Sequence, residues 1–324
     1  MSLDSFFEPA QKAAQLAKLD LFHFVSRGKV THRLRVTRFN GEERVNDGYD
    51  FDVELLAPQD LDPLHTLEEE LLGHPGSLVM MDANDEPRMV HGVVTGYEVI
   101  GSLDRESVRL RLRLSPRFSL LKMRYHSRIF QDETVPAIVS KILAEWRVPH
   151  VFELVGSYTP RSYCTQYHET DFDFVRRILA REGIYFYFRQ GPDAEVEQLV
   201  FADEALYKRL PGLRGKLSMR SGRFEIGEGD IVEMGIRRRL RPTAARIGDF
   251  DFKNPRLPMR SLEVTSDPKG VAGDLGSEKL GTYEFSHEAE HEVGASAQRR
   301  DQTATRMLQS LRSDGLLVIG TSRS

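Results

Sequence analysis

The sequence has little cysteine and no long apolar run, and each shortage excludes a class of protein. One cysteine occurs in 324 residues, so neither an internal disulfide framework nor a cysteine-based zinc cluster can form. No apolar stretch approaches the roughly 20 residues that a membrane-spanning helix needs. Residues 1–21 contain Asp4 and Glu8 and lack an apolar core, so they do not form a secretory signal peptide. These features predict a soluble protein made in a reducing compartment, with no membrane insertion by this segment.

An excess of charge of one sign is lacking as well. The 45 Lys and Arg residues nearly balance the 49 Asp and Glu residues, for a formal net charge of -4. Such a balance argues against a surface that tracks nucleic acid or an anionic membrane. Hydrophobic residues make up 40% of the chain, which is enough for a sizeable core, and the length predicts two or three domains.

Short runs with period two dominate the first third of the chain. Residues 108–114 read Val-Arg-Leu-Arg-Leu-Arg-Leu, so Arg109, Arg111 and Arg113 are predicted to share one face of a strand, opposite the leucines. Turn sequences such as Asn40-Gly41 separate these runs. Short strands joined by polar turns predict an antiparallel sandwich or barrel with one wet face.

The period changes to that of helices in the middle of the chain. Apolar residues recur at helical spacing over 134–146, with Pro136 in the first turn. A second helix is predicted to begin at Thr170, with a capping-box-like Asp173, and to end at Gly183. The aromatic run 185–188 follows at once and predicts a buried strand. This zone is therefore α+β.

Short strands return after about residue 217, followed by one more helix. The strands are expected near 231–234, 245–247 and 261–264, and the helix over about 295–312. The apolar run 315–320 reads as a strand with no partner downstream.

Several segments, in this order, resemble the VgrG family, the spike proteins of type VI secretion systems. The residues that carry the resemblance are Leu71-Leu72-Gly73, Val90-His91-Gly92-Val93-Val94-Thr95, residues 110–116, Ser127-Arg128-Ile129-Phe130-Gln131-Asp132 with Val135-Pro136-Ala137-Ile138-Val139, and above all 163–175 with 182–188. The resemblance covers the chain from about residue 20 to its end. It is a resemblance to the N-terminal half of the family, which is similar to the baseplate hub protein of contractile-tail phages.

The resemblance implies a fold class of α+β: two antiparallel β-barrel-like hub domains and an α+β middle domain. The implied divisions are an N-terminal arm over 1–20, a first hub barrel over 21–121, the middle domain over 122–216 and a second hub barrel over 217–324. The second barrel is expected to be incomplete, because the sequence ends where that barrel still needs strands. Within these 324 residues, no OB-like domain, needle repeat or effector segment is expected.

The resemblance also implies an assembly role without catalysis. In the family this half forms a homotrimer whose six barrels make a ring on the hexameric Hcp tube. Baseplate components and effector or adaptor proteins are the further expected partners. The chain is expected to assemble in the cytoplasm and to leave through the type VI apparatus without a signal peptide. No catalytic, cofactor-binding or metal-binding residue is predicted. A baseplate hub of a phage or phage-derived particle is the alternative within the same class.

An alternative from another class rests on His287-Glu288-Ala289-Glu290-His291, which matches the H-E-x-x-H pattern of zinc hydrolases. On a helix, His287 and His291 could bind Zn²⁺ while Glu288 activates water. Catalytic zinc usually takes a third protein ligand, and no His or Glu follows Glu292. We therefore favour a polar connecting loop over a metal centre.

The other candidate residues have structural interpretations that we favour. Cys164 and His168 could form a thiol–imidazole pair, but in an extended segment they lie too far apart, so Cys164 is predicted to be a buried structural thiol. The arginines of 237–241 would divide between two strand faces, which favours a solvated strand or a subunit contact over a nucleic-acid patch. The acidic run 68–70 is predicted to be a solvated face of a short helix over 64–72, with a contact to a basic patch of another subunit left open.

Overall fold

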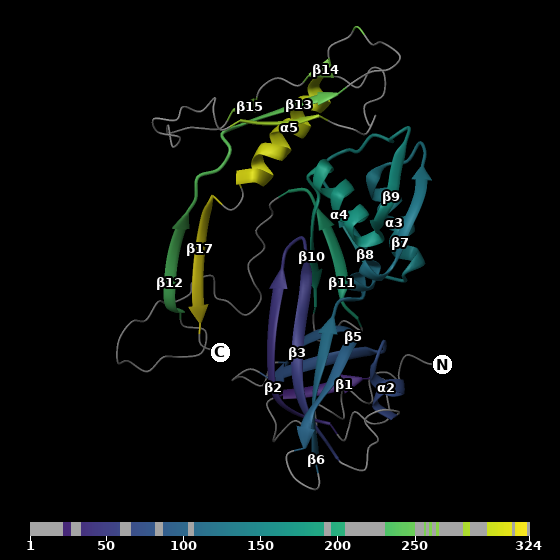
Figure 1. Cartoon of the computed structure of the whole chain (residues 1–324), viewed down its shortest axis with the longest axis vertical. Helices are drawn as coiled ribbons and strands as arrows, with labels where there is room; N and C mark the ends of the chain where they lie inside the picture. Colours follow the sequence, from purple (N-terminus) through teal and green to yellow (C-terminus); the bar gives the residue numbers. More distant parts are fainter. Residues whose placement is uncertain are drawn as a thin grey trace.

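The fold is described from a computed structural model of the whole chain, and most of its regular structure is β-strand (Figure 1). The structure describes residues 22–26, 34–58, 66–81, 87–102, 107–190, 196–204, 231–249, 256, 259–260, 264–265, 281–285, 297–312 and 315–322. Among these residues, no helix is long and apolar enough to cross a membrane.

The first part of the chain forms a six-stranded sheet with the order β1-β4-β5-β6-β3-β2, in which every neighbouring pair is antiparallel. Its strands are β1 (Phe22–Ser26), β2 (Arg35–Arg44), β3 (Gly48–Pro58), β4 (Pro75–Met81), β5 (Pro87–Ser102) and β6 (Ser107–Ser115). A short helix, α2 (Thr66–Leu71), precedes β4. The predicted antiparallel character is confirmed.

This sheet is strongly curved, and its two outer strands approach each other. The rings of Phe22 on β1 and Phe39 on β2 meet edge to face with centroids 5.1 Å apart. Irregular register in β5 between Val94 and Gly96 and between Val99 and Gly101 contributes to the bend, because bulges increase local twist. The described strand order nevertheless begins at β1 and ends at β2. The described part of this sheet is thus a half-barrel. The arrangement of two barrels expected from the sequence is not confirmed.

Alternation in β6 sets which face of the sheet is buried. Leu110, Leu112 and Leu114 are fully buried in the core between the curved strands. The intervening arginines lie on the outer face, as the period of two predicts. The sequence pattern therefore fixed the wet and dry faces of this sheet correctly.

The helical middle of the chain is built around its own apolar core, which the structure places beside the six-stranded sheet (Figure 1). Its elements are the 3₁₀ segment η2 (Arg117–Met123), β7 (Tyr125–Phe130), α3 (Val135–Glu145), β8 (His150–Glu153), β9 (Cys164–Thr170), α4 (Asp171–Glu182), β10 (Tyr185–Arg189) and β11 (Gln198–Ala202). Strands β7 and β9 pair as a two-stranded ribbon, and β10, β11 and β8 form a three-stranded sheet. Both predicted helices are confirmed.

Helix α4 begins and ends at the residues that its sequence indicates. The Thr170 hydroxyl accepts a hydrogen bond from the Asp173 backbone N–H at 3.0 Å, which satisfies one free donor of the first turn. Thr170 Oγ1 in turn donates to the Asp173 carboxylate at 2.6 Å, so this is a variant of the capping box. Gly183 ends the helix with φ of 71°, a left-handed conformation that costs glycine nothing.

Strand β10 differs from its prediction as a buried strand. It lies at the edge of the order β10-β11-β8, and only Phe186 of the four aromatic residues 185–188 is buried. Strand β11 takes the central, buried place instead. Strand β8 joins β11 in parallel, a pairing that local alternation does not reveal because parallel neighbours are far apart in sequence.

The C-terminal part contains a small sheet covered by a helix and a separate two-stranded ribbon (Figure 1). The elements are β12 (Ile231–Arg238), β13 (Ala244–Asp249), β14 (Met259–Arg260), β15 (Val264–Thr265), β16 (Gly281–Phe285), α5 (Ala297–Arg312) and β17 (Leu316–Ser322). Strands β13 and β16 are parallel, so the described C-terminal sheet is mixed rather than the expected all-antiparallel barrel. The apolar strand predicted near residue 318 is β17, and it pairs antiparallel with β12, which precedes it in the chain.

Contacts of strand β10 join the six-stranded sheet to the middle core. Asn46, in the turn between β2 and β3, exchanges two hydrogen bonds of 2.9 Å with the backbone of Phe186 on β10. The Phe188 ring packs edge to face on Tyr49 of β3 at 5.1 Å and also packs against the middle core. The two cores are therefore continuous at β10.

Candidate functional site

The residues singled out for catalysis do not form a catalytic site in the described structure. Cys164 is buried on β9, whereas His168 is exposed four residues later with a φ of 48°, so the two residues lie in different environments. The predicted burial of Cys164 is confirmed, and Arg161 Nη1 lies 3.8 Å from its sulfur. The segment 287–291 of the zinc hypothesis lies outside the described residues. Within them, no group of three His, Cys, Asp or Glu residues could hold a metal ion.

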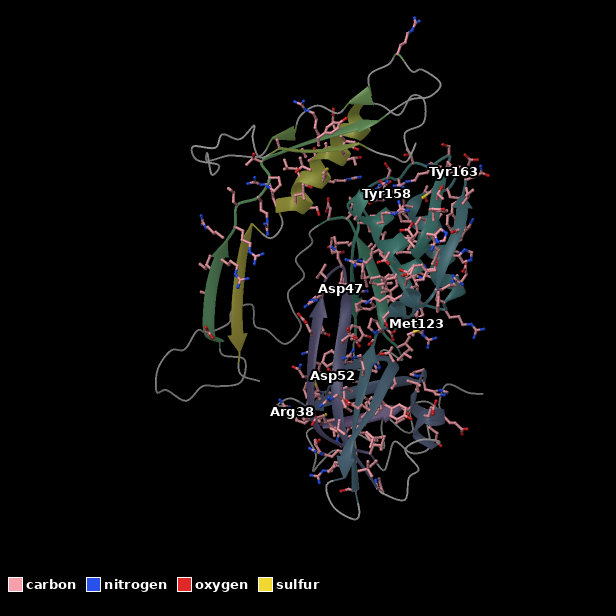
Figure 2. The ribbon with its side chains drawn as sticks, viewed as in Figure 1. Arg38, Asp47, Asp52, Met123, Tyr158 and Tyr163 are labelled. Atoms are coloured by element: carbon pink, nitrogen blue, oxygen red, sulfur yellow. The ribbon has the colours of Figure 1, made fainter. Side chains whose placement is uncertain are left out.

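The arginine face of β6 pairs with acids of its own sheet. Arg111 contacts Glu54 on β3 and Glu98 on β5 at 3.1 and 3.2 Å, and Arg113 contacts Asp52 on β3 at 3.1 Å. Figure 2 labels Asp52 on this sheet. These partly exposed pairs each contribute at most about 1 kcal/mol. The face is a charge-balanced, solvated surface, which agrees with the wet face that the alternation predicts.

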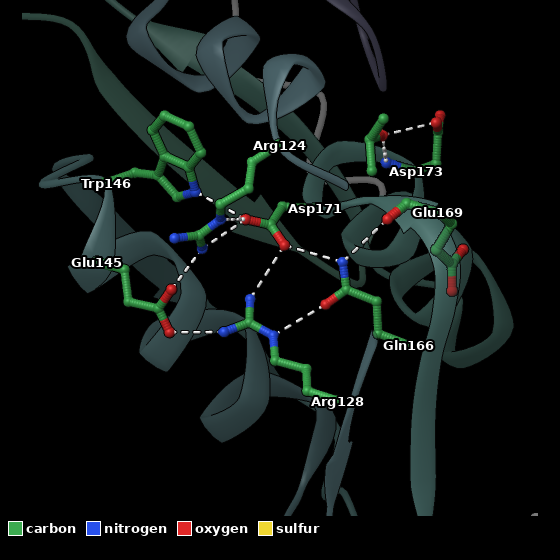
Figure 3. Close-up of polar contacts among 9 residues, drawn as sticks. Arg124, Arg128, Glu145, Trp146, Gln166, Glu169, Asp171 and Asp173 are labelled. Carbon is green, nitrogen blue, oxygen red and sulfur yellow. Dashed lines mark hydrogen bonds and ion pairs between the residues drawn. The ribbon is translucent and has the colours of Figure 1, made fainter. Parts of the chain in front are cut away.

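A highly connected polar group of the described residues is a carboxylate that the sequence did not single out. Asp171, the first residue of α4, has a fully buried side chain and is surrounded by hydrogen-bond donors from four other segments (Figure 3). Its Oδ2 accepts from Arg124 Nε at 2.7 Å and Trp146 Nε1 at 2.9 Å. Its Oδ1 accepts from Gln166 Nε2 at 2.8 Å and Arg128 Nη2 at 3.1 Å.

A second, partly exposed carboxylate, Glu145, binds the same two arginines. Glu145, at the end of α3, accepts from Arg128 Nη1 at 2.7 Å and also from Arg124 (Figure 3). The Arg124 guanidinium additionally stacks over the Trp146 ring at 4.9 Å. Two arginines and two carboxylates thus neutralise each other, which is the condition under which burying charge is tolerated.

Electrostatics show that the network holds Asp171 ionised. Burial by itself raises the pKa of the Asp171 carboxyl, but hydrogen bonds from Gln166, Trp146 and Arg124 outweigh burial and leave the pKa below its ordinary value. The pKa of Glu145 is lowered in the same way by Arg124 and Arg128. The network therefore ties the β7–β9 ribbon to the ends of α3 and α4, and its function is structural.

The outer face of the β7–β9 ribbon exposes large apolar side chains. They are Met123 (70% exposed), Tyr125 (72%), Ile129 (53%), Tyr163 (46%) and Tyr167 (72%). Figure 2 labels Met123 and Tyr163 near the two ends of this region. Tyrosine and methionine are enriched in protein–protein interfaces, so this face is a candidate contact surface. Sequence periodicity indicated the strands but could not show which face would remain uncovered.

A buried polar cluster lies between the six-stranded sheet and the middle core. Tyr49 on β3 donates its hydroxyl proton to the backbone carbonyl of His91 on β5, and the His91 backbone N–H donates to the Gln190 side chain after β10. Glu197 is 3% exposed and accepts from the Arg117 backbone N–H at 2.7 Å. Burial raises the pKa of the Glu197 carboxyl above its ordinary value, and the Arg117 N–H opposes that rise only partly.

A buried ion pair links the middle core to the C-terminal helix. Arg161 contacts Glu182 at the end of α4 at 2.8 Å, and Arg306 on α5 contacts the same carboxylate at 3.4 Å. Arg306 also donates to the backbone carbonyl of Arg181 at 3.3 Å and lies against Gly183. The end of α4 is thus the docking point of α5.

Two charged segments noted in the sequence lie on different parts of the described structure. Glu68 and Glu69 are exposed on α2, which supports the predicted solvated helix face. Arg237 and Arg238 are exposed on β12, opposite Leu317 and Leu316 of β17. As neighbours along a strand they point to opposite faces, as predicted.

Comparisons with known families and proteins found the following similarities. A profile of the phage tail baseplate hub (GPD) family matches residues 42–324. The type VI secretion system spike protein VgrG4b of Pseudomonas aeruginosa is 35% identical over 240 residues, which are 72% of this chain and 28% of that protein. VgrG1b of the same organism is 28% identical over 232 residues, or 70% of this chain and 30% of the relative. The chain therefore spans under a third of the length of these two relatives.

Solved structures show the same fold. The c3393 protein of Escherichia coli, a type VI secretion component described as similar to tail proteins gp27 and gp5 of bacteriophage T4, superimposes with a TM-score of 0.53 at 25% identity. That match covers 67% of this chain and 56% of the other. A tail protein from Neisseria meningitidis MC58 gives a TM-score of 0.57 at 13% identity over 93% of this chain and 80% of the other, a likeness of fold alone.

Proposed function

The chain belongs to the phage tail baseplate hub (GPD) family, and from this membership we propose that it is a structural component of a type VI secretion spike. The observation that carries the proposal is the 35% identity to a spike protein over 72% of this chain. In this proposal the chain forms the hub that connects the Hcp tube to the needle and helps deliver effectors. Its task is mechanical, with binding energy spread over large subunit contacts.

The geometry supports a non-enzymatic role. Buried charges of the middle core are engaged in structural networks around Asp171 and Glu182, so they are not available as a general acid or base. Large apolar side chains gather instead on an exposed ribbon, as expected for a protein that works through contacts. The zinc-hydrolase alternative at His287, Glu288 and His291 finds no support in the family or its spike-protein relatives.

The finer assembly belongs to the same proposal. Three copies form the hub, and each supplies the half-barrel described here and a second barrel-like unit from the C-terminal part. Baseplate components and an effector or adaptor bind the outer surfaces. Assembly takes place in the cytoplasm, before export through the secretion apparatus. The curvature of the six-stranded sheet supports the ring, because a curved sheet suits a wall around a central axis.

A hub of a phage-type tail is the second candidate. The observation that favours it is the fold match to a tail protein over 93% of this chain. The 35% identity to a spike protein is higher than the 13% identity to this tail protein, which favours the secretion system.

Native mass spectrometry of the full chain, purified without chelator, tests the proposal. A species of three times 37.0 kDa without zinc is the expected result. A second measurement adds purified Hcp hexamer or, in a parallel sample, phage tail-tube protein, and binding to Hcp supports the spike. A monomer that carries one zinc ion and loses it in His287→Ala would overturn the proposal.

A further inference from the structure

Strand β12 of the β12–β17 ribbon is exposed along most of its length. Every β12 side chain from Glu233 onward, and the two residues that follow the strand, are exposed. Among the residues that the structure describes, the ribbon has two strands. An isolated pair of strands is marginally stable in water and needs a covering surface to bury its apolar side chains. The exposed β12 side chains are therefore a candidate surface for a partner.

The ribbon offers a mixed apolar and basic surface. Met234, Ile236 and Leu240 are 46, 67 and 50% exposed, and their even spacing places Met234 and Ile236 on one face of the strand. Arg237 and Arg238 lie at the same end of β12 and add positive charge to both faces. The chemistry that fits this surface is an apolar patch flanked by carboxylates.

Helix α2 of this chain carries a surface of that chemistry. Glu68 and Glu69 are exposed, and Leu72, one turn after Glu68, is 39% exposed. The Leu72 backbone N–H donates to the Glu68 carbonyl at 3.1 Å, so the helical turn continues to Leu72 and brings the acid and the leucine onto one face. Figure 1 shows α2 and β12 on opposite sides of the molecule, so α2 does not cover β12 in the same copy.

We propose that the β12–β17 ribbon of one copy docks on the α2 face of a second copy through the β12 face that carries Met234, Ile236 and Arg238, with Arg238 opposite Glu68. Complementary patches on opposite sides of one chain produce a head-to-tail contact, which closes into a ring when the rotation between copies permits. The apolar residues of the ribbon then pack on Leu72. The inference rests on the proposed homotrimer and names the surfaces that hold it together.

A charge-swap series tests the pairing. Glu68→Arg and Arg238→Glu are each expected to weaken association by roughly tenfold, because like charges then face each other. The chain that carries both substitutions regains opposite charges at the contact and is expected to recover the trimer. Native mass spectrometry across a dilution series gives the association constants. Higher salt should weaken the wild-type trimer and the double variant alike.

A matched isoleucine pair distinguishes this ribbon from the other exposed apolar surface. Ile236→Lys on β12 should reduce the trimer, whereas Ile129→Lys on the β7–β9 face should not, although both side chains are more than half exposed. Circular dichroism checks that each variant stays folded. A trimer unchanged by the charge reversals, or lost in Ile129→Lys only, overturns the docking site and leaves the proposed hub intact. A wild-type chain that stays monomeric with Hcp present overturns both.

Discussion

Replacing Asp171 with asparagine is expected to destabilise the middle core by about 3–5 kcal/mol at neutral pH, the range for removing one partner of a buried ion pair. The carboxylate accepts from two arginines, Gln166 and Trp146, with three contacts on Oδ2 and two on Oδ1. Asparagine keeps one acceptor and turns an amide N–H₂ toward donors. Of the two carboxylates in the network, only Glu145 would then remain to balance the partly buried guanidinium groups of Arg124 and Arg128.

Urea unfolding measured by fluorescence is the appropriate assay, since Trp146 is the single tryptophan of the chain and donates directly to Asp171. Circular dichroism gives the same transition independently of the indole environment. Asp173→Asn is the matched control: that carboxylate is exposed on the same helical turn, and its replacement should change stability by less than about 1 kcal/mol.

The dependence on pH provides a second readout of the same carboxylate. Its pKa in the folded state is below the ordinary value of 3.8, so its contribution is fully present above pH 3.8 and is lost as the pH falls through the folded pKa. The difference in the free energy of unfolding between wild type and Asp171→Asn should therefore shrink to near zero in acid. A variant within about 0.5 kcal/mol of wild type at pH 7, or a gap unchanged in strong acid, would refute the role of the network.

Three further predictions, two for substitutions and one for thiol labelling, concern other parts of the core. Ile178→Asp places an unpaired charge at a fully buried position of α4 and should cost more than about 4 kcal/mol, which leaves the middle core unfolded by circular dichroism; a normally folded variant would contradict the helix placement. Glu197→Gln removes a buried carboxylate of raised pKa and should increase the free energy of unfolding at pH 7, with the gain shrinking as pH falls toward 4.5; a loss at pH 7 would show that the charge is needed. Cys164, at 2% exposure, should react with a thiol reagent only on unfolding, and fast labelling of the folded chain would argue against its buried place.

Local patterns predicted the elements of the middle core well, and the reason is visible at α4. Its start at Thr170 and its end at Gly183 depend on side-chain and backbone geometry within a few residues, which a sequence displays directly. The same holds for β6, where the alternation of Leu and Arg determined the buried face. The family resemblance, carried mainly by 163–175 and 182–188, was confirmed over residues 42–324.

The features that the sequence did not reveal depend on segments far apart in the chain. The parallel pairs β8–β11 and β13–β16, and the place of β10 at a sheet edge, depend on which strands meet after folding. Asp171 lies in the first turn of a helix, where acids are common, yet its donors lie on β7 and β9 and directly after η2 and α3, through contacts up to 47 residues apart.

The sequence by itself thus determined the helices, the wet and dry faces of the strands and the family, because these follow from short-range geometry and from residue patterns that relatives share. Only the tertiary structure decided which charges are buried and which apolar faces stay uncovered. Burial is a property of the packed chain. Ile129 and Ile178 are both apolar residues of regular elements, but packing leaves Ile129 exposed on β7 and buries Ile178 on the inner face of α4.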